Sequence, residues 1–180
     1  DDMQNIFFTK LPIELLAHSM HAGVLAVRLL REVQIPGIRE AVFVTAAFLH
    51  DLGKAHWPEK FIMAPRYLLS NSEWYTMRAH PLVSADIASE LGVCPEAVEI
   101  IRQHHERPGG KGYPLGIEPS EAAMWLSAVD VVAAMSEPRA YRKNLPSIDE
   151  IRRELAWCPT HIRETVINLV INAKTVKEAI

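Results

Sequence analysis

Residues 41–54 read AVFVTAAFLHDLGK, a mostly apolar run that ends in His50-Asp51 and then in Leu52-Gly53-Lys54. The apolar spacing predicts a helix, and Gly53 is a favourable residue for its C-terminal end. Two ionisable side chains at this position are costly to bury without a partner. A divalent metal is such a partner, because neutral imidazole and carboxylate are both good ligands. The alternative is a His and an Asp that face solvent at a helix end.

The same helical periodicity extends over almost the whole chain, and alternating strand-like runs are scarce. The expected helices cover residues 12–33, 38–52, 71–91, 95–105, 121–135, 147–157 and 160–179. Pro81 predicts a kink or a break in the third of these, and the glycine-rich segment 108–114 predicts a loop. Neither repeats nor low-complexity linkers occur in the 180 residues. The sequence therefore predicts a single-domain, all-α helical bundle.

Composition restricts the class of partner. The formal net charge of −3 gives no sign of the clustered basic face that a long nucleic acid requires, whereas a small phosphate ligand needs only a few cations. Cys94 and Cys158 form no CxxC pair, which indicates buried thiols in a reducing compartment. No apolar stretch reaches the roughly 18 residues of a membrane span, and no signal peptide is visible. We therefore expect a cytoplasmic protein without a membrane span in this chain.

Further imidazoles and carboxylates occur where packing does not explain them well. His104-His105 precede the glycine loop, His80 precedes Pro81, and Asp130 lies inside the apolar helix 121–135. His18 lies on the first helix, with Glu14 four residues earlier on the same face. Together with His50 and Asp51 these groups are too many for one tetrahedral zinc ion. They predict a multinuclear site with oxygen and nitrogen ligands.

Several runs occur in the order and at the spacing of a known family. They are His50-Asp51-Leu52-Gly53-Lys54, His80-Pro81, His104-His105-Glu106-Arg107, Gly112-Tyr113-Pro114, Asp130 and the segment with Arg139, Tyr141 and Arg142. Over about residues 18–142 the chain resembles the HD-GYP family. The resemblance implies an HD-type helical bundle that hydrolyses cyclic di-GMP to linear pGpG and, in some members, to GMP. The opening Asp1-Asp2-Met3 suggests that residues 1–180 are an HD-GYP-like domain cut from a longer protein with an N-terminal sensory or regulatory domain.

The resemblance also implies a metal centre, usually of iron or manganese, although zinc and nickel suit the same donors. The implied ligands are His18, His50, Asp51, His80, His104, His105 and Asp130. Glu14 occupies the position of an additional glutamate in members that bind a third metal. His21 is a rival for the role of His18, but the spacing to His50 favours His18. His56 and His161 match no motif position.

The expected mechanism follows from paired cations. Asp51 would bridge two metals roughly 3.5–4 Å apart, and a hydroxide held between them would attack phosphorus. Lys54 is expected to contact the scissile phosphate or a metal-bound group; its alternative role is to satisfy a helix C-terminus. Tyr113 offers a ring for guanine stacking and a hydroxyl group, or serves only the loop. The predicted substrate-binding set is Lys54, Arg107, Lys111, Tyr113, Arg139 and Arg142.

Three positions depart from the family pattern. Gly109 and Ala133 stand where members commonly carry Asp, and Ala140 replaces a proline. A lost acid near Lys54 would remove a proton-transfer partner or change how that lysine is held. Two alternatives to a cyclic di-GMP phosphodiesterase therefore stay open. One is an HD phosphohydrolase that acts on another nucleotide or phosphate ester, and the other is a catalytically weak signalling module that binds diguanylate cyclase (GGDEF) domains.

Overall fold

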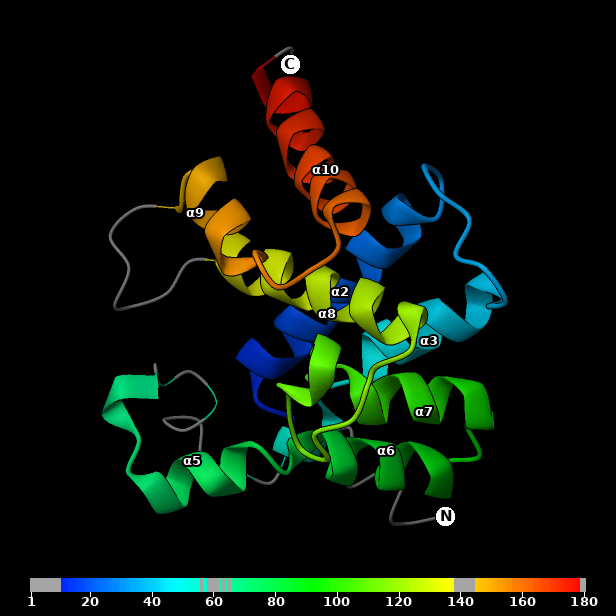
Figure 1. Cartoon of the computed structure of the whole chain (residues 1–180), viewed down its shortest axis with the longest axis vertical. Helices are drawn as coiled ribbons and strands as arrows, with labels where there is room; N and C mark the ends of the chain where they lie inside the picture. Colours follow the sequence, from blue (N-terminus) through cyan, green and yellow to red (C-terminus); the bar gives the residue numbers. More distant parts are fainter. Residues whose placement is uncertain are drawn as a thin grey trace.

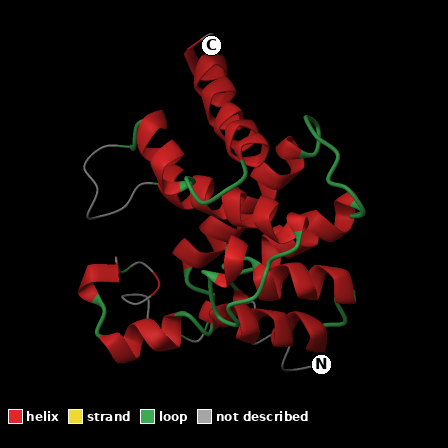
Figure 2. Cartoon of the chain, viewed as in Figure 1, coloured by secondary structure: helices red, strands yellow, loops and turns green. Residues whose placement is uncertain are grey.

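The structure, a computed structural model, describes residues 11–55, 57, 62, 64, 66–137 and 145–178, with side chains as far as residue 171. Helices and loops make up the described residues, and no strand occurs among them (Figure 2). The α-helices are α2 (Ile13–Leu29), α3 (Glu40–Leu49), α5 (Asn71–Met77), α6 (His80–Glu90), α7 (Pro95–Gln103), α8 (Glu121–Ser136), α9 (Ile148–Glu154) and α10 (Thr160–Glu178). The prediction of an all-α bundle is confirmed. His56, Arg139 and Arg142 lie outside the described residues.

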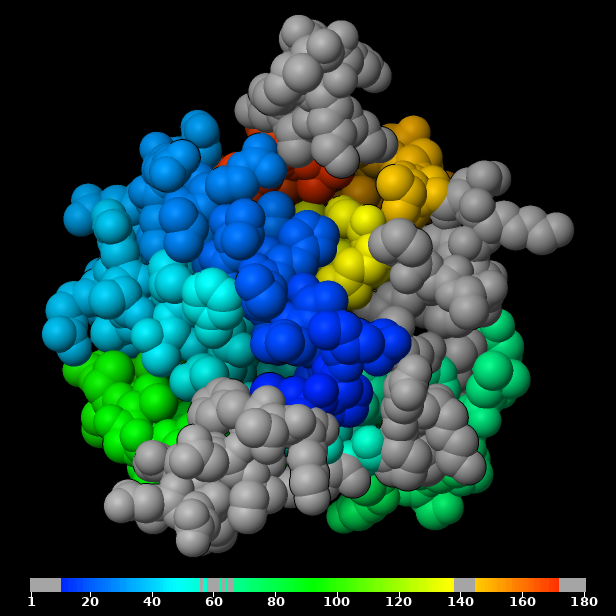
Figure 3. Space-filling model, turned by 180° about the vertical axis from the view of Figure 1, so that it is seen from behind, coloured from blue at the N-terminus to red at the C-terminus, as the bar shows by residue number. Residues whose placement is uncertain are grey.

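Helix α8 runs through the middle of the bundle (Figure 1). It packs against α2, α3, α7, α9 and α10, and α6 and α7 form an antiparallel pair on one side of it. The apolar faces of these helices meet in one core, whose fully buried side chains include Leu29, Phe43, Ile101, Leu126 and Ile167. Full burial of one such side chain stabilises the fold by about 1.5–3 kcal/mol. Seen from behind, α2 lies at the surface next to α3 (Figure 3).

The helix that carries the His-Asp pair is shorter than predicted. Helix α3 ends at Leu49, and the chain continues through a short 3₁₀ helix, η1 (Leu52–Lys54). The prediction that Gly53 ends the α-helix is therefore wrong. A Cβ atom on Gly53 would lie 2.7 Å from the carbonyl oxygen of His80, and its backbone N–H donates to Ser84 Oγ at 2.8 Å. Glycine is required here because η1 presses against the start of α6.

The break at Pro81 is confirmed. Helix α5 ends at Met77 and α6 begins at His80, with Pro81 in its first turn, where a missing N–H costs no helical hydrogen bond. His80 therefore lies where two helices meet, and Pro81 has no N–H to donate to the carbonyl of Met77, the residue four positions earlier. Two further 3₁₀ helices are η2 (Arg66–Leu68) and η3 (Pro108–Gly110). Among the described helices, none has the length and apolar character needed to cross a bilayer.

Candidate metal centre

Three histidines are oriented by the backbone in the same way. The Nδ1–H of His50 donates to Ala47 O at 2.8 Å, that of His80 to Met77 O at 2.7 Å, and that of His104 to Ile101 O at 2.6 Å. Each ring thus uses the carbonyl three residues before it, at a helix end where that carbonyl is available. The hydrogen bond places the proton on Nδ1 and leaves the Nε2 lone pair for another partner.

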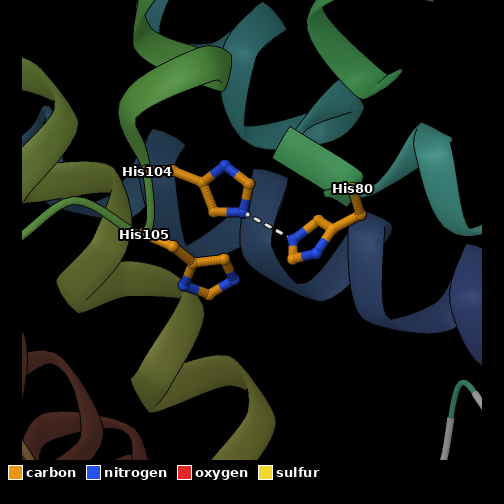
Figure 4. Close-up of side chains that lie close together, drawn as sticks. All are labelled: His80, His104 and His105. Atoms are coloured by element: carbon orange, nitrogen blue, oxygen red, sulfur yellow. Dashed lines mark hydrogen bonds between the residues drawn. The ribbon is translucent and has the colours of Figure 1, made fainter. Parts of the chain in front are cut away.

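The Nε2 atoms of His80 and His104 lie 3.1 Å apart, and the ring of His105 lies beside both (Figure 4). With both Nδ1 protons donated to carbonyls, two neutral rings direct lone pairs at one another, which is unfavourable. Two nitrogens each about 2.1 Å from one cation and at right angles to each other are separated by about 3 Å. The observed spacing therefore fits two neighbouring ligands of one metal ion, with one ring nitrogen of His105 also within reach.

A second group of ligand atoms lies next to the first. His18 Nε2 is 3.0 Å from Asp130 Oδ1, and His50 Nε2 is 3.6 Å from the same oxygen. His18 comes from α2, His50 from the end of α3 and Asp130 from the middle of α8. Their ligand atoms all lie within 4.8 Å of one another, as required of residues that share a cation.

Asp51 lies between the two groups. Its Oδ1 is 3.2 Å from His80 Nε2, whereas its Oδ2 is 3.7 Å from both His18 Nε2 and His50 Nε2. One oxygen thus faces each group, which is the orientation of a carboxylate that bridges two metal ions. The ring nitrogens and carboxylates needed for two cations are therefore present and suitably placed.

The burial of unpaired polar atoms supports the same assignment. His50 Nε2 and Asp51 Oδ1 are buried and have no hydrogen-bond partner in the part of the chain that the structure describes. A buried acceptor without a partner costs about 1–3 kcal/mol. A cation bound at these atoms would remove that cost, so the donor set fits a metal centre.

The electrostatics keep most of the ligands in the protonation state that binds metals. Burial lowers the pKa of His104 and His105 well below the usual value, and burial with the charge of Lys54 lowers that of His80. Burial opposes ionisation of Asp51, but Lys54 and His50 outweigh it and hold the pKa of this carboxyl well below its usual range. These imidazoles are therefore neutral and Asp51 is ionised near pH 7.

His18 and Asp130 differ from the other ligands because they bind one another. Burial opposes the charge on both, yet hydrogen bonds with Asp130 and Glu137 raise the pKa of His18 to about 10. The contacts with His18 and His50 likewise hold the pKa of Asp130 well below its usual range. A metal bound at His18 must displace a proton, so binding at this ligand releases H⁺.

The glycine loop holds His105 in place. The buried carboxylate of Glu106 accepts hydrogen bonds from the backbone N–H groups of Leu115, Gly116 and Ile117, at 2.7–3.2 Å. A Cβ on Gly112 would lie 2.4 Å from the backbone of Glu106 and Arg107, so only glycine allows this close approach. As a result the ring of Tyr113 stacks on His105, with centroids 4.7 Å apart and planes 28° apart.

A cavity of about 210 Å³ opens onto these ligands. Its polar wall is formed by Glu14, His18, Asp51, Lys54, His80, His105 and Asp130. Leu69, Trp74 and Met77, near and within α5, form an apolar wall, and Tyr113 closes one side. Among the described residues, no histidine lines a larger hollow of about 740 Å³ between the end of α8 and α9. The smaller cavity is therefore the candidate site.

Arg107 and Lys111, two members of the predicted substrate-binding set, lie outside the cavity. The guanidinium of Arg107 donates to Ser127 Oγ at 2.5 Å and to Glu106 O at 2.9 Å, and its carbon lies 3.7 Å above the ring of Trp157. Lys111 is exposed on the loop, and neither residue lines the cavity. Arg107 instead joins the loop to α8 and to the segment after α9. Both side chains thus lie outside the cavity in which the other predicted substrate contacts Lys54 and Tyr113 lie.

Two positions that depart from the family pattern do not line the cavity. Gly109 is on the exposed side of the loop, where its N–H donates to Glu118 at 2.7 Å and its φ is +73°. Ala133 is buried in the core on α8. Neither lines the cavity, so both leave the set of candidate ligands unchanged. The third departure, Ala140, lies outside the described residues.

Sequence reasoning missed two acidic residues. Glu106 has no predicted role beyond its place in the His104-His105-Glu106-Arg107 run, yet it anchors the loop. Glu137, just beyond α8, accepts a hydrogen bond from His18 Nδ1 at 2.8 Å. Its seven-residue spacing from Asp130 places both on one face of α8, and that is the only signal in the sequence.

Comparisons with known proteins identify the family of this chain. Residues 15–135 match the family model described as HD domain. Over 146 residues the chain is 32% identical to a cyclic di-GMP phosphodiesterase of Pseudomonas aeruginosa, covering 78% of this chain and 34% of that protein. It is 33% identical over 147 residues to a cyclic di-GMP phosphodiesterase of Thermotoga maritima, covering 77% and 38%. The chain thus spans little more than a third of these relatives' lengths.

Solved structures show the same fold. An HDG"Y"P protein from Bdellovibrio bacteriovorus superimposes with a TM-score of 0.71 at 18% identity, over 87% of this chain and 52% of that one. The HD domain of the L. monocytogenes phosphodiesterase PgpH, in complex with cyclic-di-AMP, gives 0.65 at 18% identity over 96% and 97%. Residues 15–135 match that family model and include the His and Asp side chains of the candidate metal centre, and this chain belongs to the HD domain family.

Proposed function

We propose that this chain is a metal-dependent phosphodiesterase that hydrolyses a cyclic dinucleotide, with cyclic di-GMP as the leading candidate substrate. The observation that carries the proposal is the position of Asp51, which presents one oxygen to His80 and the other to His18 and His50. Relatives named for cyclic di-GMP and for 3'3'-cGAMP cleavage support this class of substrate.

Residues of both groups would hold the metal ions. His80, His104 and His105 would bind one cation, His18, His50 and Asp130 would bind another, and Asp51 would bind both. Glu14 lines the cavity beside them and is the candidate ligand for a third. Two such cations lower the pKa of water and neutralise the charge that develops on the phosphate. Iron or manganese is the proposed metal, and zinc and nickel suit the same donors.

The remaining residues of the cavity would bind and orient the substrate. Lys54 lies against the candidate ligand Asp51, lines the cavity and would contact a phosphate oxygen. Burial raises the pKa of Tyr113, so its hydroxyl stays protonated and can donate a hydrogen bond, but it cannot serve as a base. The ring of Trp74 on the apolar wall is a surface on which a purine could stack. Trp74 is thus added to the proposed substrate contacts, with Arg139 and Arg142 retained from the sequence.

The competing functions predict different products. Manganese-loaded protein would be incubated separately with cyclic di-GMP, 3'3'-cGAMP, cyclic di-AMP and a simple phosphate monoester, and the products separated by chromatography. Linear dinucleotide or GMP formed by the parent protein and absent with Asp51→Asn supports the proposal. Cleavage of the monoester alone supports the broader phosphohydrolase.

A catalytically weak signalling module predicts a different result. It would cleave none of these compounds and would bind a diguanylate cyclase domain, a partner that stays a prediction for this chain. The positions of Gly109 and Ala133 away from the cavity favour the enzyme, because the residues that depart from the family pattern are not among the candidate ligands.

A further inference from the structure

His18 differs from His50, His80 and His104 in the kind of group that accepts its Nδ1–H. His50, His80 and His104 lie at helix ends and donate their Nδ1–H to a carbonyl three residues earlier. His18 lies inside α2, where backbone carbonyls are engaged in helical hydrogen bonds. A ligand in the middle of a helix therefore needs an outside group to hold its ring.

Glu137 is placed to be that group. Its Oε1 lies 2.8 Å from His18 Nδ1, although the two residues are 119 positions apart. At Glu137 the backbone leaves α8 with an extended conformation, φ −85° and ψ 144°. Asp130, two turns earlier on the same face of α8, contacts the opposite ring nitrogen, Nε2, at 3.0 Å. Helix α8 and the residue after it thus hold both nitrogens of one ring from α2.

We propose that Glu137 is a positioning residue for the metal ligand His18, an inference that rests on the metal centre under the proposed function. A carboxylate that accepts the Nδ1–H fixes the tautomer, so that Nε2 is the nitrogen available to a cation, and it holds the plane of the ring. The negative charge also makes the imidazole a stronger donor. Loss of such an outer partner typically weakens metal affinity by about 10–100-fold.

His21 offers a rival explanation for Glu137. Its Nδ1 lies 3.4 Å from the same oxygen, Oε1, and its side chain is 33% exposed. If the only role of Glu137 were its ion pair with His21, it would link the end of α8 to α2 and would not affect metal binding. The two roles are separable because each histidine can be removed by itself.

A double-mutant cycle with Mn²⁺ distinguishes the two roles. The chain of residues 1–180, stripped of metal with a chelator, would be titrated with Mn²⁺ by calorimetry. Glu137→Ala is expected to weaken one class of Mn²⁺ site by about 10–100-fold. Glu137→Gln should recover part of the affinity, because its amide oxygen still accepts the Nδ1–H. Glu90→Ala, an exposed glutamate at the end of α6, is the matched control and should match the parent.

Introducing Glu137→Ala into variants that already lack His18 or His21 shows through which histidine Glu137 affects Mn²⁺ binding. In His18→Ala protein, Glu137→Ala should cause no further loss, whereas in His21→Ala protein the full loss should persist. Equal losses in both backgrounds, or Mn²⁺ affinity in Glu137→Ala within twofold of the parent, would overturn the inference. Should Glu137→Ala lose its helical circular dichroism, the same cycle with Glu137→Gln decides.

The readout separates this inference from the proposed function. The titration uses no substrate, so a chain that binds Mn²⁺ with the predicted pattern but cleaves no cyclic dinucleotide would contradict the function alone. Parent protein that binds no Mn²⁺ would contradict both.

Discussion

Lys54 Nζ lies 2.6 Å from Asp51 Oδ2, the oxygen that also faces His18 and His50. The side chains of both partners are largely buried, with exposures of 15% and 3%. The ammonium group thus lies against the proposed bridging carboxylate and lines the cavity. This contact favours a role in the site over the alternative role of satisfying the helix C-terminus.

Replacing Lys54 by Met should separate metal binding from turnover. The change removes a cation that competes for Asp51, so Mn²⁺ should bind at least as tightly as in the parent. Turnover of the cyclic dinucleotide should fall by about 10–100-fold, because a charged hydrogen-bond donor to the phosphate is lost. Steady-state kinetics beside Mn²⁺ titration would check this, with Lys54→Arg as the charge-preserving comparison. Unchanged kcat in Lys54→Met would exclude the phosphate contact.

Metal-stripped protein should be most stable at about pH 7. Below that pH the unfolded chain protonates His80, His104 and His105, whose pKa values are lowered in the folded chain, so stability falls as the pH falls. Above it the folded chain keeps a proton on His18, whose pKa is raised to about 10, and the unfolded chain releases it. Stability therefore also falls as the pH rises toward 10.

Urea midpoints of stripped protein from pH 5.5 to 9 would test this dependence. Mn²⁺-loaded protein is the comparison, because a cation at His18 replaces the proton and should remove the alkaline decline. A midpoint of the stripped protein that rises steadily from pH 6.5 to 9 would show that His18 is not held as the contacts with Asp130 and Glu137 require.

The stack of Tyr113 on His105 predicts different effects for two substitutions. Tyr113→Phe keeps the ring and should leave metal affinity unchanged, with only the hydroxyl contact to substrate lost. Tyr113→Ala removes the ring and should weaken Mn²⁺ binding by several-fold, since aromatic pairs contribute about 0.5–1.5 kcal/mol. Calorimetric titration of both variants would measure this. Equal Mn²⁺ affinities in the two would mean that the ring does not hold His105.

Arg107 is predicted to act on stability. Arg107→Ala leaves Ser127 without its charged donor and removes the contact above Trp157, so unfolding free energy should fall by about 2 kcal/mol. Lys111→Ala, at an exposed position on the same loop, should change it by less than about 0.5 kcal/mol. Chemical denaturation would provide both values. An Arg107→Ala protein of parental stability but with a greatly raised KM would restore the phosphate-binding role predicted from the sequence.

Local patterns predicted the helices and a multinuclear site, and the family resemblance implied which ligands form it. Apolar periodicity marked each helix, and Pro81 marked the break that places His80 at a helix start. The ionisable groups were recognisable because Asp130 lies in an apolar helix and His50-Asp51 end another. The structure brings Asp51, Asp130 and the paired His104 and His105 together, as the sequence led us to expect.

Contacts between segments that are distant in the sequence could not be predicted from local patterns. The bond from Glu137 to His18 depends on how α2 and α8 pack, and the seven-residue spacing from Asp130 to Glu137 does not specify that packing. Arg107, beside the histidine pair, is equally suited by sequence to a phosphate or to Trp157; only the path of the loop distinguishes them. Gly53 has a sequence context typical of a helix end, yet it is required by the close approach of α6.

The most direct test of the account is the metal content of the parent chain purified without added metal, measured by inductively coupled plasma mass spectrometry. Two groups of imidazoles joined by Asp51 predict at least two equivalents of first-row transition metal per chain. Less than one equivalent, with no gain after incubation with Mn²⁺ or Fe²⁺ and removal of the excess, would contradict it.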